Sequence, residues 1–154
     1  MLKKTLVLIL CLFVSACGYE AIYSKKNPII NDFSISELIF NGDGVVNLKI
    51  KEKLNNYTLA KKNKSFKLKI SSTTEKTVIA KDATGDPTSF KTVIVIIVEV
   101  FIKNDFKNTL QIVKNFSYDN NTNKIDLKRY EREIKNNLAE TATDELIFKL
   151  SKIQ

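Results

Sequence analysis

Apolar and polar residues alternate along much of this 154-residue chain, which is the period-two pattern of half-buried β-strands. The alternation is clearest at Phe66, Leu68 and Ile70, which are separated by lysines. A later run, TVIVIIVEVFI, is so dense in β-branched residues that it indicates a strand buried over most of its length. The sequence therefore predicts four strands, at Phe33–Phe40, Phe66 to about Ala80, Phe90–Lys103 and Thr109–Tyr118.

Apolar residues three or four positions apart predict two helices. The shorter helix spans about Val45–Asn55, and Asp43 lies where a carboxylate can cap its first turn. The longer helix spans Ile125–Ile153, and we expect its apolar stripe to cover a sheet rather than to bind a membrane or a cofactor. The stripe consists of Leu127, Tyr130, Ile134, Leu138, Ala142, Leu146, Leu150 and Ile153. Turns or loops are predicted at Asn41–Gly44, Asp82–Ser89, Asn104–Asn108 and Asp119–Lys124.

These elements follow one another as strand, helix, three consecutive strands and helix. The order predicts a single α+β domain over residues 33–154. We expect a two-layer sandwich, in which a four-stranded, mostly antiparallel sheet carries two helices on one face. The sequence shows neither an internal repeat nor a second domain.

The first 17 residues, MLKKTLVLILCLFVSAC, have the features of an export signal. Two lysines precede a short apolar core, and small residues stand before Cys17. The apolar core is too short for a transmembrane helix, which needs about 20 residues. The ending Val14-Ser15-Ala16-Cys17 resembles the bacterial lipobox, in which the cysteine is lipidated. We therefore expect a cleaved signal peptide at residues 1–16, lipidation of Cys17 and a lipidated leader at residues 17–32.

Gly18 follows the lipidated cysteine, where an aspartate would favour retention in the inner membrane. We therefore expect an outer-membrane, lipid-anchored, periplasm-facing protein. The net charge of +8 favours an anionic partner, and export argues against nucleic acid. The abundance of lysine has a second explanation, because the bias of an AT-rich genome toward Lys, Asn and Ile would also produce it.

The sequence offers little chemistry for catalysis. It contains no histidine, and its two cysteines are Cys11 in the signal and Cys17 at the lipidation site. The usual zinc ligands and Ser-His or Cys-His nucleophiles are therefore missing. Asp82 and Asp86 share a turn, where acids usually accept backbone hydrogen bonds. We expect no enzyme activity, no metal and no cofactor.

The chain resembles the LptE family of lipopolysaccharide-assembly lipoproteins, in its alphaproteobacterial form. The resemblance covers nearly the whole chain. It rests first on Cys17-Gly18-Tyr19 followed by a short aromatic leader ending at Tyr23, and second on the turn DATGDPTSFK running into a long apolar strand. The third feature is a terminal helix whose Tyr130, Ala139, Ala142, Asp144 and Leu150 are similar to a tyrosine-and-alanine pattern of the family. The chain has Lys91 where the family often has arginine.

The resemblance implies a protein that partners and plugs a large outer-membrane β-barrel, the LptD-like lipopolysaccharide translocator. Such a protein assists assembly of the barrel and insertion of lipopolysaccharide into the outer leaflet. Lys81, Lys91 and Lys76 are then the candidate contacts to lipid A phosphates, although an ordinary solvated lysine is the simpler interpretation of each. Two alternatives remain open. One is a pilotin-like chaperone of another outer-membrane complex, and the other is a stand-alone lipid- or glycan-binding lipoprotein.

Overall fold

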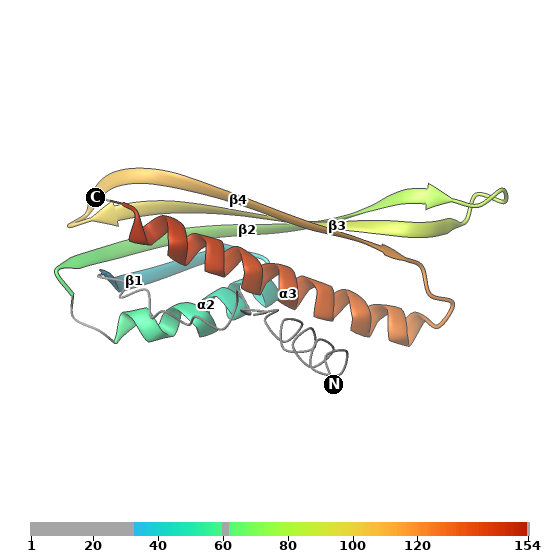
Figure 1. Cartoon of the computed structure of the whole chain (residues 1–154), viewed down its shortest axis with the longest axis horizontal. Helices are drawn as coiled ribbons and strands as arrows, with labels where there is room; N and C mark the ends of the chain where they lie inside the picture. The colour runs from blue at the N-terminus through green and yellow to red at the C-terminus, as the bar shows by residue number, and fades with distance from the viewer. Residues whose placement is uncertain (1–32, 60–61, 154) are drawn as a thin grey trace, which may run out of the picture. The chain divides into compact units, whose positions relative to one another are not determined.

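The computed structural model describes residues 33–59 and 62–153, which form a four-stranded sheet and two helices (Figure 1). The predicted signal peptide, lipidated leader and Cys17 lie outside the described residues. Each predicted strand and helix is present. The elements are β1 (Phe33–Gly42), α2 (Gly44–Thr58), β2 (Lys64–Lys81), β3 (Pro87–Ile102), β4 (Asp105–Asp119) and α3 (Lys124–Ser151).

The strands are arranged in the order β1-β2-β3-β4. β1 runs parallel to β2, because α2 carries the chain back to the same end of the sheet, and the other two pairs are antiparallel. The sheet is therefore mixed and mostly antiparallel, as predicted. Side chains alternate between its two faces, and both helices pack on one of them.

The core lies between the helices and this covered face of the sheet. Residues at alternate positions of β3, such as Ile94, Ile96 and Val98, are buried against apolar residues of both helices. Small residues allow α3 to pack closely against the rest of the core. Ala139 and Ala142 are both fully buried there. Burial of each large side chain contributes about 1.5–3 kcal/mol, which is how a domain without a disulfide between described residues is held together.

The two helices begin at side-chain caps. The Asp43 carboxylate accepts hydrogen bonds from the backbone N–H groups of Val45 and Val46, at 3.0 and 3.2 Å, as the sequence predicted. Asn123 does the same for α3, where its Oδ1 accepts from the N–H groups of Ile125 and Asp126. Each cap satisfies donors that the first helical turn leaves without an intrahelical partner.

The predicted turn at Asn104–Asn108 is wrong. The chain reverses within Lys103 and Asn104, whose φ angles are both positive, at 51° and 71°. Two residues in this conformation form the tight hairpin turn whose twist matches that of the adjoining strands. β4 therefore begins at Asp105, and the polar segment that follows continues the strand instead of forming a loop.

The β2–β3 hairpin reaches beyond the part of the sheet that the helices cover (Figure 1). β4 ends opposite Ser89, so that the last residue of β2 and the first residues of β3 have no partner in β4. The side chains from Glu75 to Asp86 are exposed. A second, smaller apolar cluster supports the base of this hairpin, and it consists of Phe90, Tyr118, Leu127 and Ile134.

Candidate functional site

The three candidate lysines lie along the projecting hairpin, but they do not form one cluster. Lys76 pairs with Thr92 across the β2–β3 ladder, and the next position pairs Thr77 with Lys91. Since neighbouring ladder positions point to opposite faces, Lys76 and Lys91 lie on opposite faces of the sheet. Lys81 is the last residue of β2 and lies opposite Pro87, beside the turn.

Lys76 is engaged in the contacts that join the hairpin to α3. Its ammonium lies 2.5 Å from the Glu131 carboxylate and 3.8 Å from the centre of the Phe90 ring. An ion pair and a cation–π contact together hold its side chain on the covered face. Among the described residues, neither Lys81 nor Lys91 forms a salt bridge with a carboxylate.

Tyr118 joins the same group of side chains. Its hydroxyl donates to Glu131 Oε1 at 3.1 Å and accepts from the buried Thr92 hydroxyl at 3.4 Å. Burial raises the pKa of Tyr118, and the neighbouring Glu131 carboxylate raises it further, because both disfavour a phenolate. The Tyr118 side chain is therefore a neutral hydrogen-bond donor that fixes β4 against α3.

The turn at the tip of the hairpin is held by its own acids. Asp82 Oδ1 accepts hydrogen bonds from the N–H groups of Thr84 and Asp86 and from the Thr84 hydroxyl. The Thr84 hydroxyl and the Asp86 N–H lower the pKa of Asp82, because they stabilise the carboxylate. Gly85 has a φ of +91°, a conformation that favours glycine. Asp82 therefore accepts backbone hydrogen bonds, as predicted for the acids of this turn.

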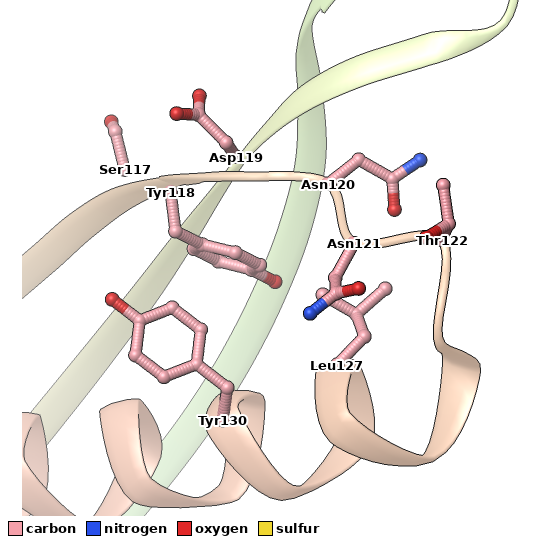
Figure 2. A pocket seen from close by; sticks show the side chains of 8 residues that line it. All are labelled: Ser117, Tyr118, Asp119, Asn120, Asn121, Thr122, Leu127 and Tyr130. Atoms are coloured by element: carbon pink, nitrogen blue, oxygen red, sulfur yellow. The ribbon is translucent and has the colours of Figure 1, made fainter.

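An open depression of about 570 Å³ lies where β4 passes into α3 (Figure 2). Tyr118 and Tyr130 line it with their rings 5.9 Å apart and nearly perpendicular. Its other lining residues are Ser117, Asp119, Asn120, Asn121, Thr122 and Leu127. A smaller, more apolar hollow adjoins it along α3, beside Phe116 and Ile134.

This depression was not predicted from the sequence. Tyr130 belongs to the apolar stripe of α3, and Phe116 belongs to the apolar positions of β4, so both were expected to be buried. They are 44% and 45% exposed. The helix diverges from the strand here, and Figure 2 shows the two tyrosines directed into the resulting space. The one signal in the sequence was the polar tip of each tyrosine, which favours a position at the edge of the core.

The face of the sheet opposite the helices has a centre without charge. Its cross-strand rows are Ser71–Ile97–Gln111 and Thr73–Val95–Val113. Ile97 and Val113 are 42% and 48% exposed. Charged residues border these rows on both sides, with Lys69 and Glu99 at one side and Glu75 at the other. This open face is a flat surface, part apolar and part polar, on which another protein can pack.

The described residues contain no group of three or more histidines, cysteines or acids that could hold a metal ion. None of the described helices is long and apolar enough to cross a bilayer. The described residues bring together tyrosines and amides around one depression, lysines along a hairpin and an open face of the sheet.

No protein-family model and no curated protein matches the chain. Solved structures do match in fold. Rare lipoprotein B from Shewanella oneidensis is 11% identical, with a TM-score of 0.59, and the match covers 75% of this chain and 93% of that one. A minor lipoprotein from Acinetobacter baumannii is 9% identical, with a TM-score of 0.55, and 75% and 90% of the two chains are covered. For uncharacterized lipoprotein B from Nitrosomonas europaea the identity is 11%, the TM-score 0.52 and the coverage 77% and 86%. At these identities the likeness establishes the architecture: the chain has the same α+β fold as these lipoproteins.

Proposed function

We propose that this chain is an outer-membrane lipoprotein that partners and plugs the lipopolysaccharide-translocating β-barrel. It would assist assembly of the barrel and insertion of lipopolysaccharide into the outer leaflet. The observation that carries the proposal is the combination of an export signal ending at Cys17 with a domain whose fold matches solved lipoproteins. The resemblance of the sequence to the LptE family supports the same assignment.

The open face of the sheet supports packing inside a barrel. The lumen of a large outer-membrane barrel is lined by polar side chains. A surface on which Ile97 and Val113 alternate with serine, threonine and amide side chains can pack against such a wall without burying an unpaired charge. The helices on the other face keep the sheet rigid, so that the domain can act as a plug.

The hairpin supports contact with lipopolysaccharide phosphates. Lys81 lies beside its turn, and Lys91 lies on β3 between Thr77 of β2 and Ser117 of β4. Neither lysine has a carboxylate partner among the described residues. Their ammonium groups can therefore approach an anion without first breaking an ion pair. Lys76 differs, because Glu131 and Phe90 already hold its side chain. We assign the phosphate contacts to Lys81 and Lys91, and give Lys76 the role of fixing the hairpin to α3.

The proposal is tested by purifying the tagged protein from its own membranes in mild detergent and identifying what stays bound by mass spectrometry. We expect one large outer-membrane barrel at equal stoichiometry. Recovery of a secretin would instead identify a pilotin-like chaperone, and recovery of no barrel from a well-folded protein would contradict the plug.

Lipopolysaccharide contact is tested separately by charge reversal on the hairpin. The Lys81→Glu, Lys91→Glu double variant should bind purified lipopolysaccharide at least about 10-fold more weakly, since each phosphate contact is electrostatic. The matched control is Lys51→Glu with Lys107→Glu, which makes the same change of charge at exposed positions of α2 and of β4 near the β3–β4 turn. Equal losses in the two double variants would show that only net charge matters and would remove the assignment to the hairpin.

A second candidate function, a stand-alone glycan-binding lipoprotein, is favoured by the depression beside α3. Tyrosine rings, amides and hydroxyls are groups that can stack on and hydrogen-bond to a sugar, and Tyr118, Tyr130, Asn120 and Asn121 place them together. In that case the protein would be recovered without a barrel, and Tyr130→Ala would abolish binding of an isolated core oligosaccharide.

A further inference from the structure

The lysines of the described chain are concentrated at the end of the sheet opposite the β2–β3 turn. Three segments meet there: residues 62–67 leading into β2, residues 101–108 around the β3–β4 turn, and residues 148–153 at the end of α3. Phe66 pairs with Ile102 in the sheet, and the Lys64 ammonium donates to the Ile153 carbonyl at 2.8 Å. We call these three segments the lysine end.

The lysine end carries nearly all of the excess positive charge. It has seven lysines and one acid, Asp105, whereas the rest of the described chain has 13 basic and 14 acidic side chains. Lys67 and Lys149 are paired with Glu37 and Glu145. Five others form no salt bridge with a described carboxylate, namely Lys62, Lys64, Lys103, Lys107 and Lys152.

Large apolar side chains are exposed among these lysines. Phe106 is 58% exposed and contacts Phe101 edge-on, Phe148 is 48% exposed, and Leu59 at the end of α2 is 87% exposed. The Lys152 ammonium lies 4.0 Å from the centre of the Phe148 ring. Aromatic and aliphatic side chains set among lysines are typical of surfaces that bind the anionic interface of a membrane.

The chain also enters the described domain at the lysine end. β1 is parallel to β2, and its first residue, Phe33, pairs with Lys64. The chain that arrives from Cys17 therefore enters the described domain at the lysine end. The intervening residues can span at most about 55 Å when fully extended, so the tether holds this end within reach of the bilayer.

From these observations we infer that the lysine end is a docking surface for anionic phospholipid headgroups, such as phosphatidylglycerol, in the leaflet that holds the tether. The inference takes the lipidation of Cys17 from the proposed function, but needs neither a barrel nor lipopolysaccharide. A weak surface suffices, because a short tether makes docking intramolecular, at an effective concentration of the order of millimolar. Docking orients the domain with its β2–β3 hairpin directed away from that leaflet.

The test uses the chain from residue 17 onward with Cys17→Ser, so that no acyl group binds the membrane, and its fold is checked by circular dichroism. Co-sedimentation compares vesicles of phosphatidylcholine with vesicles that also contain about 30% phosphatidylglycerol, at low salt. We expect phosphatidylglycerol to raise the partition coefficient at least about 10-fold, and half-molar salt to reverse the gain.

Two variants with the same change of net charge locate the surface. Replacing Lys62, Lys103, Lys107 and Lys152 by glutamine should remove the gain from phosphatidylglycerol. Replacing Lys81, Lys91, Lys124 and Lys128 by glutamine should preserve it within about 3-fold, because those lysines lie near the opposite end. Absence of any gain, or equal losses in both variants, would overturn the inference.

A final experiment distinguishes phospholipid binding from lipopolysaccharide binding. The lysine-end variant should bind purified lipopolysaccharide as the parent does, since the proposed phosphate contacts are on the hairpin. Loss of lipopolysaccharide binding with retained phosphatidylglycerol binding would overturn the docking surface. The vesicles contain no barrel, so failure of this test leaves the proposed function standing, and failure of the membrane pull-down leaves the docking surface standing.

Discussion

Gly42 marks the point where β1 ends and the chain turns into α2. Its φ is +96°, and a methyl group added to it would lie 1.9 Å from the carbonyl oxygen of Ser72. The neighbouring Asp43 N–H donates to that same oxygen, which holds the backbone of the turn against β2. Only a residue without a side chain fits this close approach.

Gly42→Ala should therefore lower the free energy of unfolding by at least about 2 kcal/mol, from the clash and the positive φ together. Gly44→Ala is the matched control, because a methyl group there meets nothing within 4 Å and falls at the start of a helix. Denaturant unfolding measures both. Comparable losses in the two variants would show that chain flexibility, rather than the contact with Ser72, is the reason for glycine.

Asp43 combines a helix cap with an ion pair to α3. The Lys135 ammonium lies 3.0 Å from its Oδ2, and both side chains are largely buried. Burial alone would raise the pKa of Asp43, but the hydrogen bond and the charge of Lys135, with the N–H of Val46, outweigh it and lower the pKa below the ordinary value of 3.8.

A depressed pKa in the folded state means that the charged carboxylate stabilises the fold above the ordinary value. This stabilisation is lost as the pH falls from about 3.8 through the lower folded-state pKa. Asp43→Asn keeps a capping side chain and loses the charge, so at pH 7 it should be about 1 kcal/mol less stable than the wild type. The difference should vanish at the acid end of that range. A difference that stays constant with pH would remove the charge from the explanation.

The role of a single residue can be predicted from the sequence when its partners lie close to it along the chain. The Asp43 cap and the hydrogen bonds of Asp82 were predictable, because each involves atoms only a few positions away. The pairing of Asp43 with Lys135 and of Lys76 with Glu131 was not, because those partners are brought together only by packing. For the same reason the polar tips of its two tyrosines were the one signal in the sequence for the depression beside Tyr130.

Among the elements, the β3–β4 hairpin has the least suitable turn residues. Lys103 and Asn104 both adopt positive φ, which most side chains disfavour. The preferred pair for this turn is Asn-Gly. The double change Lys103→Asn, Asn104→Gly should raise the free energy of unfolding by about 0.5–1 kcal/mol, and thermal or denaturant unfolding would show it. A lower free energy of unfolding would mean that the Lys103 side chain contributes more to stability than relief of the unfavourable backbone conformation does.

The strands and helices themselves were largely predictable, because their apolar periods are strong and each spans several turns or pleats. The ends of these strands and helices were harder to predict. Residues Asp105–Asn108 are polar apart from Phe106 and were expected to form a loop, yet they continue the ladder opposite β3. An exposed edge strand needs no regular alternation of apolar residues. The first residues of β4 therefore lack the pattern by which a strand is recognised in the sequence.

Considered whole, the domain contains its entire described core within residues 33–153. Cys17, the predicted lipidation site, is not among the described residues. Cys17→Ser should abolish acylation and slow localisation to the membrane, while the thermal unfolding midpoint of the domain changes by no more than about 2 °C. Fractionation and circular dichroism measure the two effects. A variant that fails to fold would show that the tether and the domain are not separate.

The parallel pairing of β1 with β2 has a mechanical consequence. With the lipid tether that we propose at Cys17, a membrane that moved away from a domain held in the barrel would pull on the chain where it enters β1. At the lysine end that pull is directed along the strand, so it loads the β1–β2 hydrogen bonds together, in shear, instead of opening them one after another. Had the tether entered at the other end of an antiparallel edge strand, the same force could have peeled the strand away. The edge strand is therefore joined to the sheet in the direction that best resists being drawn out by its own anchor.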